Sequence, residues 1–307
     1  MKKALSILMI FAMLLMCVAC SSGSSTGEQP AQSSDTQESV EQPAEEEKPK
    51  ELAYTIENEI IVDNEYCALT VLNGEAKKSG APEFKLQMEN KTADKTLMFS
   101  IDNVSVNGWM MDPFFASSVA PGKKSNDTLS FTGDDFKACG LTSADEISFD
   151  LRVYDSDDWM ADNYVEDSFV IYPTGLTAEE VVIPERRAGA NEMVIEDNDA
   201  FTFIIVDTDP DNFWGYTLNA YLENKTDNTI MFSWDDVSVN GFMVDPFWAT
   251  SVAPGSRKIS EVNFSDSKLE ENGIETVEDV EFGLRVYNYE DWLTDDIFKG
   301  MFTYNPE

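Results

Sequence analysis

The chain has 307 residues, of which 42% are hydrophobic, including 19 Phe and 6 Trp, and its formal net charge is −37. This length suggests about two domains, and this composition supports folded cores. So acidic a chain repels phosphate backbones, which excludes a nucleic-acid partner and favours a cationic or neutral one. The sequence contains no His, which removes the commonest general base and the commonest zinc ligand.

Residues 1–19 have the pattern of a secretory signal peptide, with Lys2 and Lys3 before an apolar run that is short for a membrane-spanning helix. The run ends in C-V-A-C, from Cys17 to Cys20, which resembles a bacterial lipobox, although Cys17 stands where that motif usually has Leu. The resemblance implies cleavage before Cys20 and attachment of a diacylglycerol to its sulfur. We therefore expect lipidation at Cys20, with the membrane as a partner and the protein on its extracytoplasmic face.

Residues 20–50 are predicted to form a disordered tether. After Cys20 they are almost entirely small, polar, charged or Pro residues, and Val40 is the only large apolar one. Such a stretch cannot bury enough surface to offset the entropy lost on ordering.

The remainder of the chain is an internal duplication. Residues 96–173 align without a gap to residues 229–306, with about 32 identities in 78 positions. A self-similarity of this size predicts two homologous domains. We place them at 51–174 and 191–307, joined by a linker at 175–190.

Alternation of apolar and polar residues dominates both copies, for example in residues 84–89 and 149–154. A period of two indicates antiparallel strands with one buried and one wet face. Only two short helices are expected, at 134–139 and 267–272, each followed by Gly. The fold class is therefore predicted to be all-β, with two tandem antiparallel β-sandwich domains.

Three motifs recur in both copies at matched places: N-K-T at 90–92, V-S-V-N-G at 104–108 and V-A-P-G at 119–122. This frame resembles the Ig-like domains of uncharacterised Gram-positive surface lipoproteins. The resemblance implies an Ig-like sandwich in both copies and carries no catalytic residue across. Neither copy has the inter-sheet Cys pair of antibody domains.

The richest apolar motif is a block that follows the V-S-V-N-G motif in each copy. It is either a protruding aromatic loop that binds a ligand or a cap on the sandwich core, and burial in the core is the favoured alternative. The candidate ligand-binding residues are Trp109, Met110, Phe114 and Phe115 in the first copy, and Phe242, Met243, Phe247 and Trp248 in the second.

A possible Ca²⁺ site is formed by Asp207, Asp209 and Asp211, whose i, i+2, i+4 spacing suits hard oxygen ligands. The stretch is not an EF-hand, because its sixth position is Asn212 and its twelfth is Leu218. The alternative is a solvated turn in an acidic protein. No other cofactor is expected.

Cys67 and Cys139 are the two cysteines outside the export segment, and their counterparts in the second copy are Phe201 and Asn272. Because the second copy manages without them, two unpaired thiols are favoured over a disulfide. No nucleophile elbow, phosphate loop or zinc motif is present.

These observations favour a non-enzymatic, lipid-anchored binding or adhesion module whose ligand is an unidentified protein or glycan. The alternative is a structural or accessory lipoprotein of a cell-envelope complex.

Overall fold

The computed structural model describes residues 53–186, 188–189, 191–291 and 293–306. The signal peptide, Cys20 and the tether lie outside the described residues. No helix in the described part of the chain has the length and apolarity needed to cross a membrane.

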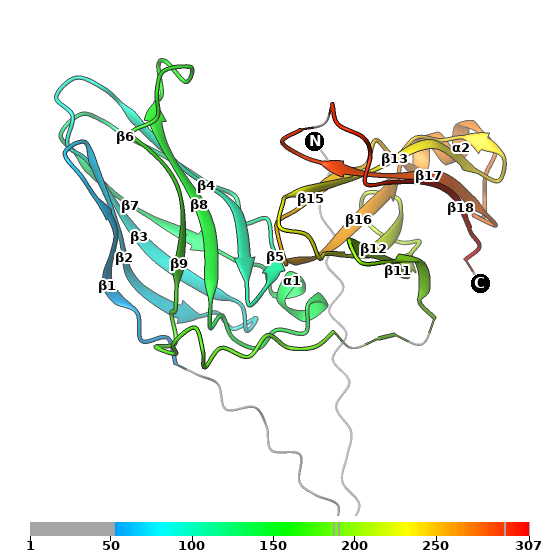
Figure 1. The fold of residues 1–307 in the computed structure, drawn as a ribbon, viewed down its shortest axis with the longest axis horizontal. Coiled ribbons are helices and arrows are strands. Elements are labelled where there is room, and N and C mark those ends of the chain that lie inside the picture. The colour runs from blue at the N-terminus through cyan, green and yellow to red at the C-terminus, as the bar shows by residue number, and fades with distance from the viewer. Residues whose placement is uncertain (1–52, 187, 190, 292, 307) are drawn as a thin grey trace, which may run out of the picture. The chain divides into compact units, whose positions relative to one another are not determined.

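The first repeat consists of two antiparallel sheets and one short helix (Figure 1). One sheet has the order β1-β2-β3-β7, and in the other β4 pairs with β5, β6 and β8, while β9 lies beyond β8. The elements are β1 (Glu57–Asp63), β2 (Cys67–Ala76), β3 (Pro82–Asn90), β4 (Leu97–Val106), β5 (Trp109–Met110), β6 (Phe115–Val119), β7 (Lys124–Ser130), α1 (Gly133–Ala138), β8 (Ile147–Asp155) and β9 (Val165–Ile171).

The second repeat has the same order of elements. One sheet has the order β10-β11-β12-β16, and in the other β13 pairs with β14, β15 and β17, while β18 lies beyond β17. The elements are β10 (Met193–Asp197), β11 (Phe201–Asp209), β12 (Tyr216–Asn224), β13 (Ile230–Val239), β14 (Phe242–Met243), β15 (Ala249–Val252), β16 (Arg257–Phe264), α2 (Asp266–Glu271), β17 (Val280–Asn288) and β18 (Phe298–Tyr304).

Each repeat closes its own core between its two sheets. The alternating strands turn large apolar side chains inward, such as Phe84 and Phe99 in the first repeat and Phe203 and Phe282 in the second. One buried member of each cluster comes from the other repeat: Tyr221 in the first core and Met110 in the second. The predicted all-β, antiparallel Ig-like sandwich architecture is confirmed.

The two predicted helices are also present, one residue earlier than expected. Helix α1 begins after Thr132, whose hydroxyl accepts a hydrogen bond from the Asp135 backbone N–H at 3.1 Å. Gly140 and Gly273 follow the two helices with φ angles of 67° and 69°, so each occupies the left-handed position that Gly tolerates at a helix end.

The Asn of the N-K-T motif explains why the motif recurs. Asn90 is buried, and its Nδ2 donates to the backbone oxygens of Lys95 and Val119, both at 2.7 Å, while its Oδ1 accepts from the N–H and hydroxyl of Thr92. Asn224 repeats this set of four bonds with Asn228, Val252 and Thr226. The side chain ties the turn after one strand to the end of another, so the motif is structural.

Candidate functional site

The apolar block of each repeat lies on a tight β-hairpin. Asn107 and Gly108 join β4 to β5 with φ angles of 49° and 76°, and Asn240 and Gly241 join β13 to β14 with 50° and 78°. Two consecutive positive φ angles are typical of the two-residue turn that Asn-Gly favours. The two hairpins are therefore equivalent in backbone and sequence, and their surroundings can be compared directly.

The first hairpin is buried against the second repeat. Trp109 forms a parallel bridge with Arg257 of β16, whose N–H donates to the Gly108 oxygen at 2.9 Å. The Trp109 indole, 2% exposed, packs edge-on against Tyr221 with ring centroids 5.7 Å apart. This contact joins the sheets of the two repeats into one nine-stranded sheet.

Two further residues of the first hairpin complete the contact. Met110 lies in the core of the second repeat, and its sulfur accepts a hydrogen bond from the Ala253 N–H at 3.1 Å. The Asp112 carboxylate forms an ion pair with the mostly buried Lys258 ammonium at 2.9 Å. The hairpin therefore uses an aromatic ring, a thioether, a carboxylate and a backbone oxygen to hold its neighbour.

The second repeat receives this hairpin on a sheet face that is unusually apolar for an outer face. Ile204, Val206 and Ile259 pack against the first core, and Tyr221 is buried. Their counterparts in the first repeat are mostly polar, being Thr70, Leu72, Asn126 and Gln87. A sheet that is covered on both faces has apolar residues on both faces. The apolar residues on the outer face of the second repeat are therefore the signal in the sequence for this contact, and the sequence-based predictions did not include it.

The second hairpin carries the same residue types, but its aromatic and Met side chains are exposed to solvent. Phe242 is 48% exposed and Met243 is 69% exposed, whereas their counterparts Trp109 and Met110 are buried. Asp245 stands where the first repeat has Asp112. The binding features of the first hairpin are thus retained on the second and face solvent.

Phe247 extends the exposed surface. Its side chain is 91% exposed, and its backbone φ is 50°, in the left-handed region that bulky residues rarely adopt. The Asp245 carboxylate holds this conformation by accepting a hydrogen bond from the Phe247 N–H at 2.7 Å. Strain of this kind at an exposed aromatic side chain points to a functional role. We call Phe242, Met243, Asp245 and Phe247 the free hairpin surface.

The eight residues of the two predicted loops therefore divide equally. Four are buried: Trp109, Met110, Phe115 and Trp248. Four are exposed: Phe114, Phe242, Met243 and Phe247.

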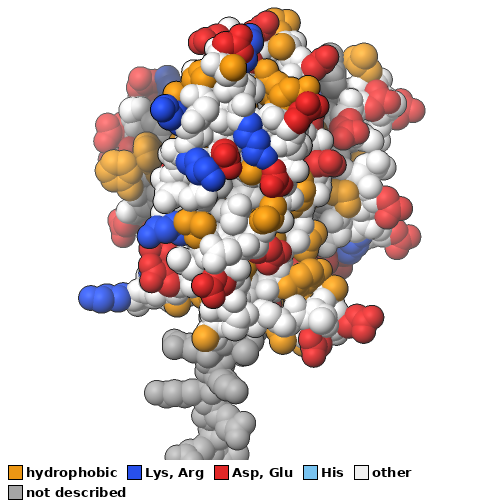
Figure 2. All heavy atoms as spheres, turned by 90° about the vertical axis from the view of Figure 1, so that its left-hand side faces the viewer, with side chains coloured by type: hydrophobic (Ala, Val, Ile, Leu, Met, Phe, Trp, Pro, Cys, Tyr) orange, Lys and Arg blue, Asp and Glu red, His pale blue; other side chains and the backbone are white. Residues whose placement is uncertain are grey.

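The face of the molecule shown in Figure 2 is mainly acidic and polar. Figure 2 shows acidic side chains spread over this face, with basic and apolar side chains in small separate groups between them. Gln87 and Asn126 are hydrogen-bonded to each other at 3.2 Å on the outer face of β3 and β7. The outer face of β3 and β7 is therefore polar at the two positions where the second repeat has Tyr221 and Ile259.

The predicted Ca²⁺ site is not assembled. Asp207 and Asp209 lie on strand β11, and Asp211 lies in the turn after it. Asp207 instead accepts from Asn219 at 2.6 Å, and Asp209 accepts from the Asp211 N–H at 3.1 Å. Within the described residues no group of three metal-ligating side chains converges, so the acidic stretch is a solvated turn.

Cys67 and Cys139 are buried free thiols, as favoured from the sequence, and form no disulfide within the described part of the chain. Burial raises the pKa of Cys67 to about 11 and that of Cys139 to about 12. Since the thiolate is the reactive form, both thiols are expected to be inert at neutral pH.

We therefore expect a chain beginning at Ser21 to incorporate no iodoacetamide at pH 8 in its native state and two equivalents after unfolding in urea. The raised pKa values also mean that the folded state disfavours the thiolates. The free energy of unfolding is therefore expected to fall as the pH rises above about 8.5, the ordinary pKa of a thiol in the unfolded chain. Mass spectrometry of the alkylated chain measures the result. Labelling of either cysteine at the rate of the unfolded chain would contradict it.

The strand topology defines a protein of two tandem antiparallel β-sandwich repeats. No protein-family model matches the chain, and no curated protein sequence matches it. Among solved structures, the Salmonella enterica SafA pilin in complex with the SafB chaperone is 11% identical, with 79% of this chain and 98% of that chain covered and a TM-score of 0.21.

Two other solved structures are similar at the same level. Red sea bream transglutaminase is 12% identical over 85% of this chain and 32% of its own, with a TM-score of 0.20. A Porphyromonas gingivalis W83 protein of unknown function is 12% identical over 76% of this chain and 98% of its own, with a TM-score of 0.19. Likeness of this extent carries no argument about function.

Proposed function

We propose that this chain is a lipid-anchored, extracytoplasmic binding protein without enzymatic activity, which holds a β-sheet domain of another envelope protein on its free hairpin surface. The observation that carries the proposal is the contrast between two equivalent hairpins. Trp109 and Met110 of the first are buried against a neighbouring sheet, while their counterparts on the second, Phe242 and Met243, are exposed. The export and lipobox pattern ending at Cys20 supports the location.

The contact made by the first hairpin defines the chemistry of the proposed partner. That hairpin accepts a hydrogen bond from an edge-strand N–H, packs an aromatic ring on a Tyr ring and pairs Asp112 with Lys258. Gly241, Phe242 and Asp245 offer the same three features. The partner is therefore expected to present an open strand edge with an apolar outer face and a basic side chain beside it.

A second copy of this chain is a poorer partner. The edge equivalent to β16 is β7 of the first repeat. Asn126 on β7 and Gln87 on the neighbouring β3 replace Ile259 and Tyr221. Ser125 replaces Lys258, so no ion pair with Asp245 could form there. The first repeat thus resembles the polar terminal cap of a repeat array, and head-to-tail self-association is disfavoured.

Photo-crosslinking in the producing cells tests the binding role. A photoreactive residue replaces Met243, and the matched control replaces Met301, which is also a Met on a β-strand and is 65% exposed against 69% for Met243. We expect position 243 to give a discrete protein adduct and position 301 to give none. The purified crosslinked partner should then bind the F242S/M243S chain at least about tenfold more weakly than the unmodified chain.

Identical adducts from both positions, or adducts only with lipid or glycan, would overturn the protein-binding proposal. The anchoring is tested separately with a clickable palmitate analogue and the Cys20→Ser chain. We expect the label and the membrane association to disappear together in the variant. An unlabelled native chain recovered from the medium would contradict the proposed anchor.

A further inference from the structure

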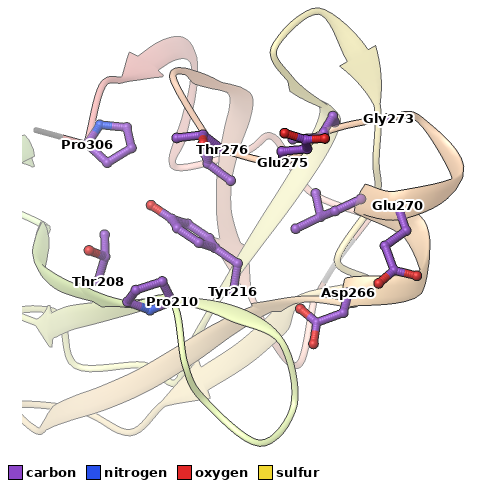
Figure 3. A pocket seen from close by; sticks show the side chains of 12 residues that line it. Thr208, Pro210, Tyr216, Asp266, Glu270, Gly273, Glu275, Thr276 and Pro306 are labelled. Atoms are coloured by element: carbon purple, nitrogen blue, oxygen red, sulfur yellow. The ribbon is translucent and has the colours of Figure 1, made fainter.

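The second repeat has an open cavity of about 770 Å³ at the end of the sandwich away from the β10–β11 turn (Figure 3). The end of β11, the start of β12, helix α2 with its following loop, and the C-terminal Pro306 surround it. Tyr216 forms one wall, and its hydroxyl is directed toward the side where Thr208, Thr276 and Pro306 lie. This volume lies in the range of small-ligand sites.

In the first repeat the same position is filled by the chain itself. Tyr54, in the segment before β1, packs edge-on against Phe84 at 5.4 Å, and its hydroxyl accepts a hydrogen bond from the Ala144 N–H at 3.2 Å. The N–H groups of Thr55 and Ile56 donate to the Pro173 oxygen at 2.8 and 3.1 Å. The first repeat is thus closed by an extended segment with an aromatic side chain.

Three positions around that segment correspond to residues that line the open cavity. Ala144 corresponds to Val277, Pro173 to Pro306, and Gly74, which lies beside Tyr54, to Thr208. The counterpart of Tyr54 itself is Ala188. The second repeat therefore keeps the walls of the position and lacks the aromatic side chain that closes it.

The linker explains why the second repeat lacks a segment of its own there. Arg186 forms an ion pair with Glu192 and stacks over the Tyr221 ring at 4.5 Å, and the Pro184 oxygen accepts from Arg257 at 3.1 Å. These bonds hold the linker beside the contact between the repeats. The linker before β10, which is the counterpart of the segment before β1, thus follows a different path. The position that Tyr54 fills in the first repeat is left open in the second.

The lining of the cavity indicates what would fill it. Leu269, Ile274 and Val277 supply apolar surface, while the exposed Asp266, Glu270 and Glu275 form an acidic rim with no basic side chain among the lining residues. Tyr216 lines the cavity beside Thr208. Its phenol ring adds aromatic surface against which an incoming side chain can pack.

We propose that this cavity is a second binding site, which takes an extended, positively charged peptide segment of a partner protein with an aromatic side chain in the place that Tyr54 fills in the first repeat. The segment would bury its ring between Tyr216 and the apolar wall, as Tyr54 does beside Phe84, and would place basic side chains at the acidic rim. The proposal is independent of the free hairpin surface.

Synthetic peptides and a chain beginning at Ser21, which keeps every described residue, test the site. The probe is the peptide of residues 48–57 (K-P-K-E-L-A-Y-T-I-E) with Glu51→Lys and Glu57→Lys, and the control peptide also carries Tyr54→Ala. We expect calorimetry at 0.15 M salt to give a dissociation constant at least about tenfold lower for the probe than for the Ala control.

Charge reversal in the protein locates the binding. Glu275→Lys removes an exposed acid at the rim, and the matched control Asp199→Lys removes an exposed acid in the β10–β11 turn. We expect E275K to weaken binding of the probe at least about fivefold and D199K to change it less than about twofold. Equal binding of the Tyr and Ala peptides, equal effects of the two reversals, or no binding of the probe at about 1 mM would each overturn the proposal.

Discussion

Replacing Trp109 by Ala should lower the free energy of unfolding by about 3 kcal/mol, whereas the same replacement of its counterpart Phe242 should lower it by less than about 1 kcal/mol. Trp109 is 2% exposed and packs against the first core and Tyr221, so its removal leaves a cavity where the repeats meet. Phe242 is half exposed and loses far less contact.

Urea unfolding followed by circular dichroism measures both variants on the chain beginning at Ser21. Because Trp109 joins the repeats, W109A should also expose the Tyr221 face and raise hydrogen exchange in β12 and β16 without doing so in β17. Equal losses of stability in the two variants would show that the two hairpins have equivalent surroundings. That result would remove the contrast on which the proposed function depends.

Replacing Asn224 by Asp should destabilise the chain by about 3 kcal/mol, since each buried group left without its partner costs about 1–3 kcal/mol. The Asn224 Nδ2 donates to two backbone oxygens at 2.8 Å, and a carboxylate at this place can only accept. The variant would therefore direct a negative charge at the Asn228 and Val252 oxygens in a buried site.

Asn228→Asp is the matched control, because it makes the same chemical change on an exposed side chain in the same turn. It should change the free energy of unfolding by less than about 0.5 kcal/mol. Acidification should reduce the deficit of N224D, since a protonated carboxyl can donate one of the two lost hydrogen bonds. A deficit in N224D no larger than in N228D would refute the structural role of the N-K-T motif.

Much of the fold was predictable from local patterns. The period-two alternation predicted the strands, and the Gly residues after the two short helices predicted their ends. The duplication predicted two equivalent units, and the structure shows one core in each. These features are local or repeat themselves along the chain, so the sequence displays them directly.

The candidate sites were predictable only in part. The sequence pointed to the two aromatic blocks but could not say which residues are exposed, because Met110 and Met243 are the same residue in the same motif. It suggested a Ca²⁺ site at Asp207, Asp209 and Asp211, but it did not show that the first two lie on strand β11 and the third in the turn after it. The sequence did not predict the open cavity beside Tyr216. The replacement of Tyr54 by Ala188 is informative only once the structure shows that Tyr54 closes the first repeat.

The sequence by itself therefore determined the duplicated β-sandwich, the two short helices and the acidic, His-free chemistry of the chain. The tertiary structure alone decided that the first hairpin is buried on the Tyr221 face while the second is free, and that Tyr54 closes one repeat while the other stays open. The physical reason is that side-chain period and turn propensity act over a few neighbouring residues. Burial depends instead on which distant surface packs against a side chain, and two nearly identical segments of one chain meet different neighbours.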